Sequence, residues 1–247
     1  MRLVGYTKLT LQDYPGYVAA MCFTGGCQLR CPYCHNPQLV LLDEQNNSVD
    51  GEEIAMTFLS YLEQRRLQLD GVVISGGEPL MQQDIEDFLR KIKGLGLAVK
   101  LDTNGLLSGK LEELIGYGLV DYVSLDYKSC KEQFAQTVGL CSPEGRSIAG
   151  IYYNYWRASL ECLRKAHISY ELRTTVVQEL HPINVLVRMA EEADILESWF
   201  LQSFMKKGLL ICDYTNPKAT LTAYSNEEMQ EIKQELLKIA PCTKLRA

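Results

Sequence analysis

The sequence lacks a long hydrophobic run, an apolar leader and an excess of basic side chains. Its longest apolar stretch, residues 17–23, is far shorter than the roughly 20 residues that cross a bilayer. The first 16 residues contain no apolar segment of the kind found in secretion signals. Lys and Arg number 25 against 31 Asp and Glu, a net charge of −6, whereas nucleic-acid-binding proteins are normally basic. We therefore expect a cytoplasmic protein with neither a membrane nor a nucleic-acid partner.

Linkers, internal repeats and low-complexity segments are also absent from the sequence. The 247 residues, 47% of them hydrophobic, are enough to bury a large core without disulfides or structural metals. Any metal site in such a protein is expected to serve chemistry rather than folding. We predict a single domain over residues 1–247, with a core of about 15–204 and a C-terminal loop and helix in 205–247.

Strand-like segments alternate with amphipathic helical patterns along the chain. A capping box, in which Asp50 or Ser225 precedes a glutamate by three residues, marks the start of two helices. This order predicts βαβ units and an α/β fold with a parallel sheet, either open or curled into a partial barrel. The predicted strands are 17–23, 71–75, 97–102, 121–126, 169–177 and 198–202. Helical spacing of apolar residues occurs in 54–62, 85–92, 111–115, 156–163, 185–189 and 229–239.

Polar motifs follow four of the predicted strands. A cysteine cluster follows the first strand, Gly-Gly-Glu-Pro at 76–79 the second, Asp-Thr-Asn-Gly at 102–105 the third, and Asp-Tyr-Lys at 126–128 the fourth. Functional groups of α/β proteins lie where strands end and loops begin. We therefore expect the four motifs to converge on one face of the sheet.

The chain has nine cysteines, but the odd number and the lack of an export signal argue against a disulfide framework. Cys27, Cys31 and Cys34 fall within eight residues and have the spacing C-x3-C-x2-C. Cysteine thiolates are soft ligands that suit zinc, copper(I) or iron–sulfur clusters. The three cysteines therefore predict a metal site.

Three other interpretations of these cysteines compete. Residues 31–35 match the C-x-x-C-H motif of haem attachment, which belongs to exported proteins. A structural zinc site would use His35, which lies directly beside Cys34 and is poorly placed to complete a tetrahedron. Buried thiols that act as small hydrophobes are the third alternative, although the flanking Gly, Arg, Pro and Asn residues indicate a loop.

An iron–sulfur cluster fits the three cysteines better. A cubane has four irons, and full ligation by protein takes four cysteines. Three close cysteines leave one iron open, and an open metal position is typical of a reactive site. Gly25 and Gly26 precede the first cysteine and allow the backbone to approach a cluster closely.

With Tyr33 between Cys31 and Cys34, the segment resembles the C-x3-C-x-aromatic-C signature of the radical S-adenosylmethionine superfamily. The resemblance implies a partial (β/α)6 barrel and a [4Fe–4S] cluster whose fourth iron binds S-adenosylmethionine. It also implies that the reduced cluster cleaves this cofactor to a 5′-deoxyadenosyl radical, which abstracts a hydrogen atom.

Further motifs resemble those of glycyl-radical-enzyme activases. Gly76, Gly77, Glu78 and Pro79 match the GGEP motif, which in the superfamily borders the amino group of S-adenosylmethionine. Residues 34–37, 101–105 and 125–128 are similar to segments of the activases, and 11–16 and 199–202 to the anaerobic ribonucleoside-triphosphate reductase activating proteins. The resemblance implies a glycyl-radical enzyme as the protein substrate and a flavodoxin- or ferredoxin-type reductant.

By the same resemblance, Lys128 pairs with the carboxylate of S-adenosylmethionine. Asp102, Thr103 and Asp126 match positions that hold a monovalent cation beside it. A lysine suits a carboxylate as a point charge, and two neighbouring carboxylates repel unless a cation lies between them. A solvated loop pair of Asp126 and Lys128 is the alternative.

Two features of the sequence depart from the activase pattern or add to it. On the last strand, Gln202 or Met205 stands where an activase has a histidine near the adenosine. Cys130 and Cys141 lack the paired spacing of a ferredoxin module, so we expect no second cluster.

The βα units use almost the whole chain and leave only residues 203–224 and one helix beyond them. Nothing in that remainder would obviously close the mouth of a barrel, so we expect a macromolecular substrate whose glycine-bearing loop enters the site. A radical S-adenosylmethionine enzyme acting on a small molecule or a peptide is one alternative. A zinc-binding module without catalysis is the other.

Overall fold

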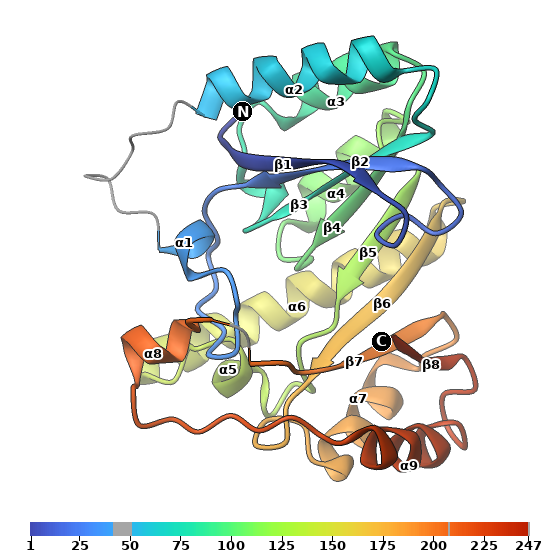
Figure 1. The fold of residues 1–247 in the computed structure, drawn as a ribbon. Coiled ribbons are helices and arrows are strands. Elements are labelled where there is room, and N and C mark those ends of the chain that lie inside the picture. The colour runs from blue at the N-terminus through green and yellow to red at the C-terminus, as the bar shows by residue number, and fades with distance from the viewer. Residues whose placement is uncertain (42–50, 207, 247) are drawn as a thin grey trace.

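The structure, a computed structural model, describes residues 1–41, 51–206 and 208–246 and contains one eight-stranded sheet in the order β1 to β8 (Figure 1). Each neighbouring pair is parallel except β1 and β2, which are antiparallel. The strands are β1 Leu3–Thr10, β2 Ala19–Thr24, β3 Gly71–Gly76, β4 Ala98–Thr103, β5 Tyr122–Asp126, β6 Ser169–Val176, β7 Trp199–Ser203 and β8 Thr243–Arg246.

The helices are α1 Pro37–Val40, α2 Gly51–Arg65, α3 Ile85–Gly94, α4 Ser108–Gly116, α5 Phe134–Thr137, α6 Pro143–Lys165, α7 Ile183–Ala193, α8 Ile211–Thr215 and α9 Asn226–Leu236, with the 3-10 turn η2 at Pro79–Met81. Figure 1 shows a curved sheet, with α2 and α3 beyond its first strands, α4 and α6 behind its middle, and α7 and α9 near its last strands. None of the described helices is long and apolar enough to cross a membrane.

The predicted α/β architecture is confirmed. The six predicted strands correspond to β2 through β7, and each pairs in parallel with the next. Helices follow these strands, as βαβ units require. Within the described residues β1 and β8 do not pair with each other, so the sheet is a partial barrel rather than a closed one.

Two strands that the sequence pattern did not predict extend the sheet on either side of residues 15–204. β1 is an edge strand with mostly half-buried or exposed residues and two irregularities in its pairing with β2. β8 has only four residues. Both lack the continuous apolar run that marks a strand buried on two faces, and the missing run explains why the pattern did not reveal them.

The predicted helices bury the faces that their spacing indicated. In α3, Ile85, Phe88, Leu89 and Ile92 are at most 4% exposed. The capping box of α9 is present, with the Ser225 side chain on the backbone N–H of Glu228 and the reverse contact as well. The other predicted N-cap, Asp50, lies outside the described residues.

The barrel interior carries charge as well as apolar side chains. Lys100 and Asp102 on β4 and Glu171 on β6 are at most 6% exposed. Arg246 of β8 donates two hydrogen bonds of 2.8 Å to the Glu171 carboxylate. Buried charges of this kind are retained when they are paired and hydrogen-bonded, and those nearest the cysteine loop belong to the site described next.

Candidate active site

The four polar motifs converge on one cavity of about 310 Å³ at the C-terminal ends of β2 through β6. The predicted site residues on its wall are Cys27, Cys31, Tyr33, Cys34, Gly76, Gly77, Asp102, Asp126 and Lys128. Asn104 and Arg173, which the sequence did not single out as site residues, also line it. Glu78, Thr103 and Gln202 are not among the lining residues.

The cysteine loop between β2 and α1 is held by backbone hydrogen bonds from several elements. The N–H of Arg30 donates to the carbonyl of Val138 over 3.1 Å, after α5. From α8, the N–H of Ile211 donates to the Cys34 carbonyl over 3.2 Å, and that of Cys212 to the Pro32 carbonyl over 3.0 Å. The path of the loop is therefore set by the surrounding fold.

The donor set suits an iron–sulfur cluster. All three thiols are free of disulfides. Burial raises the pKa of Cys27 to about 11 and that of Cys31 to about 12, so binding of a metal cluster would have to release their protons. The Leu29 N–H donates to Cys27 Sγ over 3.4 Å, a contact of the type that tunes cluster ligands. Among the described residues, no three His, Cys, Asp or Glu side chains gather closely enough for a single metal ion.

Two glycines, Gly76 at the end of β3 and Gly77 directly after it, permit this strand end to pack against the cysteine loop. Gly76 has a φ of +116°, which favours glycine. A Cβ on Gly77 would lie 2.0 Å from the Gly26 carbonyl oxygen, closer than any real contact. Backbone hydrogen bonds join the same segments, since the Glu78 N–H donates to the Gly26 carbonyl over 2.8 Å.

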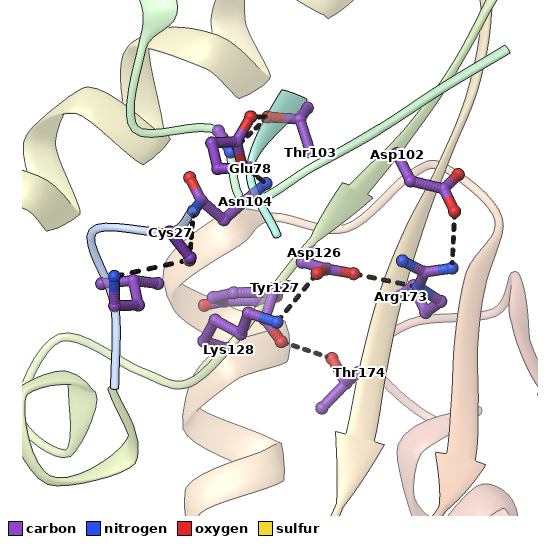
Figure 2. Close-up of polar contacts among 12 residues, drawn as sticks. Cys27, Glu78, Asp102, Thr103, Asn104, Asp126, Tyr127, Lys128, Arg173 and Thr174 are labelled. Carbon is purple, nitrogen blue, oxygen red and sulfur yellow. Dashed lines mark hydrogen bonds and ion pairs between the residues drawn. The ribbon is translucent and has the colours of Figure 1, made fainter. Parts of the chain in front are cut away.

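Glu78, which does not line the cavity, connects two of the motifs by hydrogen bonds (Figure 2). Its fully buried carboxylate accepts hydrogen bonds of 2.8 Å from the Thr103 hydroxyl and from the Asn104 N–H, and one of 3.1 Å from the Leu80 N–H. Burial raises the pKa of Glu78 to about 7, although these hydrogen bonds oppose the shift. Glu78 therefore positions the loop after β4 against the segment after β3.

Asn104 reaches from that loop to the cysteine cluster. Its Oδ1 accepts the Leu106 N–H over 3.1 Å, which fixes the orientation of the side-chain amide. Its Nδ2 then donates to Cys27 Sγ over 3.8 Å (Figure 2). The role of Asn104 depends on a contact between residues 77 positions apart, so the motif alone did not reveal it.

A chain of charges runs along the cavity wall (Figure 2). Lys128 Nζ donates to Asp126 over 2.8 Å, and Arg173 donates to Asp126 over 2.9 Å and to Asp102 over 3.3 Å. Lys100 donates to the other oxygen of Asp102. Arg173 thus connects the two carboxylates expected to hold a cation.

The same contacts set the protonation states. Burial alone would raise the pKa of Asp126, but Arg173 and Lys128 outweigh it and hold that pKa at about 2. Burial likewise opposes the charge of Lys128, and Asp126 raises its pKa well above the usual value. The Asp126 and Lys128 side chains are only 20% and 19% exposed, so the interpretation as a solvated loop pair is wrong.

The backbone of Lys128 is fixed by a buried histidine. The Val177 N–H donates to His181 Nδ1 over 3.1 Å, so Nε2 carries the proton and faces the Lys128 carbonyl at 2.8 Å. Burial lowers the pKa of His181 to about 4. His181 is therefore a neutral structural residue at this end of β5.

Residues at the end of β7 do not reach the cavity. Gln202 is paired in register with Thr175 of β6 and Arg246 of β8, and Met205 is 48% exposed beyond the strand. Thr175 lines the cavity instead. Cys130 is fully buried and Cys141 is exposed and lines a different cavity, so the two do not form a shared site.

Arg173 is the main charged residue of the cavity that sequence analysis missed. A signal was present, because Glu171, Arg173 and Thr175 alternate along one strand and share one face. Charged residues on one face of a strand expected to be buried on both sides indicate a polar interior.

Comparison with known proteins decides the family. The family model of the radical SAM superfamily matches residues 21–179, which run from within β2 past the end of β6 and include the cysteine loop. The chain belongs to the radical SAM superfamily. Within it, the chain is 32% identical over 204 residues to a Methanocaldococcus jannaschii protein named as a glycyl-radical enzyme activating enzyme, covering 82% of this chain and 80% of that one.

Other relatives agree with this group. The pyruvate formate-lyase-activating enzyme of Staphylococcus epidermidis is 37% identical over 93 residues, which are 37% of each chain. The chain is thus a radical SAM enzyme of the glycyl-radical activase group, and the zinc-module alternative is wrong.

Solved structures show the same fold. A radical SAM methyltransferase from Sphaerobacter thermophilus superposes with a TM-score of 0.64 at 15% identity, covering 94% of this chain and 67% of that one. Streptococcus suis SuiB bound to S-adenosylmethionine gives 0.59 at 16% identity, covering 91% and 49%. Membership of the superfamily implies S-adenosylmethionine and an iron–sulfur cluster as cofactors.

Proposed function

We propose that this protein works in the cytoplasm as the activase of an anaerobic ribonucleoside-triphosphate reductase, on which it generates a glycyl radical. Cys27, Cys31 and Cys34 would hold a [4Fe–4S] cluster. The observation that carries the proposal is that these three thiols share one cavity with Lys128 and Arg173. The cavity therefore offers a charged cofactor both a set of soft metal ligands and two cationic side chains that can bind a carboxylate.

When bound, the reduced cluster supplies the electron that cleaves S-adenosylmethionine to a 5′-deoxyadenosyl radical able to abstract a hydrogen atom. Lys128 and Arg173 would bind the carboxylate of the cofactor. Gly76 and Gly77 would border its amino group with backbone, since neither has a side chain that would exclude it. Tyr33, a buried residue of the cysteine loop that lines the cavity, has its ring 6.3 Å from that of His181 and would contact the cofactor.

A monovalent cation at Asp102 and Asp126 belongs to the same proposal. Arg173 now neutralises both carboxylates, and the Thr103 hydroxyl already donates to Glu78. A cation would therefore be needed only when Arg173 pairs with another carboxylate, such as that of S-adenosylmethionine. Gln202, which does not line the cavity, would contact the nucleoside only if the cofactor extends past Thr175 toward β7.

The choice of a reductase as the partner rests on the motif at residues 11–16. Asp13 of this motif lines the cavity, whereas the buried Tyr14 packs beside Tyr122 and Gly71, the first residues of β5 and β3. The motif therefore contributes Asp13 to the site, and this contact supports the choice of a reductase. The other motif, at 199–202, lies in the core, where Trp199 Nε1 donates to the Thr174 hydroxyl over 2.9 Å.

A peptide substrate is the second candidate, because residues of this chain match the PqqA peptide cyclase of Methylobacterium nodulans at 38% identity. That match covers only 47% of this chain and 30% of the cyclase, against 82% and 80% for the activating enzyme. The longer match favours the activase.

The test is radical transfer with the partner varied. Cluster-loaded protein, S-adenosylmethionine and a chemical reductant would be incubated anaerobically with the reductase or with pyruvate formate-lyase from the same organism. We expect 5′-deoxyadenosine in both mixtures and activation of the reductase alone. Activation of pyruvate formate-lyase alone would reject the reductase as partner, and cleavage without activation of either would favour the peptide or small-molecule alternative.

A further inference from the structure

The cysteine loop separates two cavities. Its odd-numbered residues from Cys27 to Tyr33 line the cavity described above, whereas Arg30 and Pro32 line a second one on the opposite side. The second cavity, of about 1090 Å³, is bounded by α5, the first turns of α6, α8 and residues 216–221. We call it the outer cavity. A wall one residue thick thus lies between the outer cavity and the cluster ligand Cys31.

The outer cavity carries positive charge that the rest of the protein does not neutralise. Arg30, Lys131 and Arg146 line it, and none of the three forms an ion pair with another described residue. Of its two carboxylates, Glu132 pairs with Arg188, and Glu179 stays ionised while it accepts the Thr222 N–H over 2.9 Å. The three cations therefore face one carboxylate that has no ion pair among the described residues. The chain as a whole has a net charge of −6, so this group of cations differs in sign from the overall charge of the protein.

The wall between the cavities is held in place from the outer side. Gly139 packs so closely that a Cβ there would lie 2.2 Å from the Arg30 carbonyl oxygen. Arg30 itself donates to the carbonyls of Cys27 and Leu29 over 2.6 and 2.9 Å. A partner in the outer cavity would therefore meet a fixed surface that is bonded directly to the loop of the cluster ligands.

We propose that the outer cavity is the docking surface for the electron donor, a small acidic protein that carries one electron at a time. This inference rests on the proposed function, which requires a reduced cluster. In the transfer, the donor loses one electron, the cluster gains it through the wall at Arg30–Pro32, and no bond or proton moves. Because the donor approaches from outside, the inner cavity stays open to S-adenosylmethionine and the protein substrate.

The experiment compares a protein donor with a small uncharged one. A charge-reversed variant, Lys131→Glu with Arg146→Glu, changes two exposed side chains of the outer cavity. A matched control, Arg66→Glu with Lys91→Glu, changes one exposed arginine and one exposed lysine near α2 and α3. Stopped-flow absorbance would follow reduction of the cluster by an acidic flavodoxin, and by photoreduced 5-deazariboflavin.

We expect the outer-cavity variant to be reduced by flavodoxin about tenfold more slowly than wild type at low ionic strength, because steering by opposite charge accelerates association by at least that factor. The difference should shrink as salt is added. Reduction by deazariboflavin, and the control variant with either donor, should match wild type. Equal flavodoxin rates for the two variants would overturn the docking surface.

Two further outcomes would distinguish failure of the docking surface from failure of the proposed function. If the outer-cavity variant, reduced by deazariboflavin, fails to activate the protein substrate, the cavity receives that substrate and the donor proposal is wrong. If wild-type protein reduced by deazariboflavin forms no 5′-deoxyadenosine, the proposed function itself fails, whatever the flavodoxin rates.

Discussion

The side-chain amide of Asn104 donates to the sulfur of Cys27 over 3.8 Å, although the two residues are 77 positions apart. The Leu29 N–H approaches the same sulfur at 3.4 Å. Donors aimed at a ligand sulfur stabilise negative charge there and therefore favour the reduced state of a cluster. With Cys27 as a cluster ligand, as we propose, Asn104 would tune the potential of the cluster without binding it.

Replacing Asn104 with Ala should make the cluster harder to reduce. A tenfold change in the reduction equilibrium on loss of this donor corresponds to a midpoint potential lower by about 59 mV. An anaerobic redox titration followed by electron paramagnetic resonance measures this directly and needs no turnover. Gln28→Ala is the comparison variant, because the Gln28 side chain accepts the Cys27 thiol over 3.9 Å and contacts the Asn104 amide, but does not donate to the sulfur. A potential equal to wild type in Asn104→Ala would show that the contact has no electronic effect.

Each of the three loop cysteines should be required for the cluster. Ala at Cys27, Cys31 or Cys34 should abolish the broad iron–sulfur absorption and all formation of 5′-deoxyadenosine, because the remaining two thiolates cannot hold a cubane. Cys162→Ala and Cys242→Ala, outside the cavity, should retain both. Cofactor cleavage that persists in Cys31→Ala would be incompatible with the assigned ligands.

Lys128→Ala should weaken binding of S-adenosylmethionine and leave the absorption of the cluster unchanged. The expected loss is about 1–3 kcal/mol, the range for a charge-assisted hydrogen bond. Asp126 keeps its pairing with Arg173 in this variant, so the fold should tolerate the change. Calorimetry gives the affinity, and Lys131→Ala, an exposed lysine of the outer cavity, is the control. Equal affinities in the two variants would remove Lys128 from the cofactor site.

Glu78 should make the free energy of unfolding depend on pH. Burial raises its pKa in the folded protein to about 7 from the usual 4.5, so the folded state holds a proton that the unfolded state has released between these values. Glu78 therefore contributes fully to the free energy of unfolding below about pH 4.5. This contribution is lost as the pH rises to about 7, and the loss is at most about 3 kcal/mol.

Urea unfolding of the cluster-free protein from pH 5 to 8 would test this contribution of Glu78. Glu78→Gln cannot ionise and should lack the corresponding decrease in the free energy of unfolding. Asp126, with a pKa of about 2, stays ionised throughout the range and should not contribute. Identical slopes for wild type and Glu78→Gln would contradict the raised pKa.

Local sequence patterns were sufficient to predict the parallel strands and the meeting of the four motifs, because both follow from periodicity and from the rule that parallel strands end at one edge. They were insufficient where the contacts are distant in sequence. Arg173 meets Asp102 across 71 positions, and the close packing of Gly77 on Gly26 is a contact between two loops. Edge strands β1 and β8 were missed because their residues are partly exposed and carry no continuous apolar run.

The central claim is that this protein places a radical on a glycine of another protein. The most direct measurement is the electron paramagnetic resonance spectrum of the reductase after anaerobic incubation with cluster-loaded protein, S-adenosylmethionine and reductant, using reductase made with ordinary or Cα-deuterated glycine. We predict a doublet with ordinary glycine that collapses toward a single line with the deuterated form. Formation of 5′-deoxyadenosine without a protein radical on the reductase, or on any other glycyl-radical enzyme of the same organism, would contradict the claim.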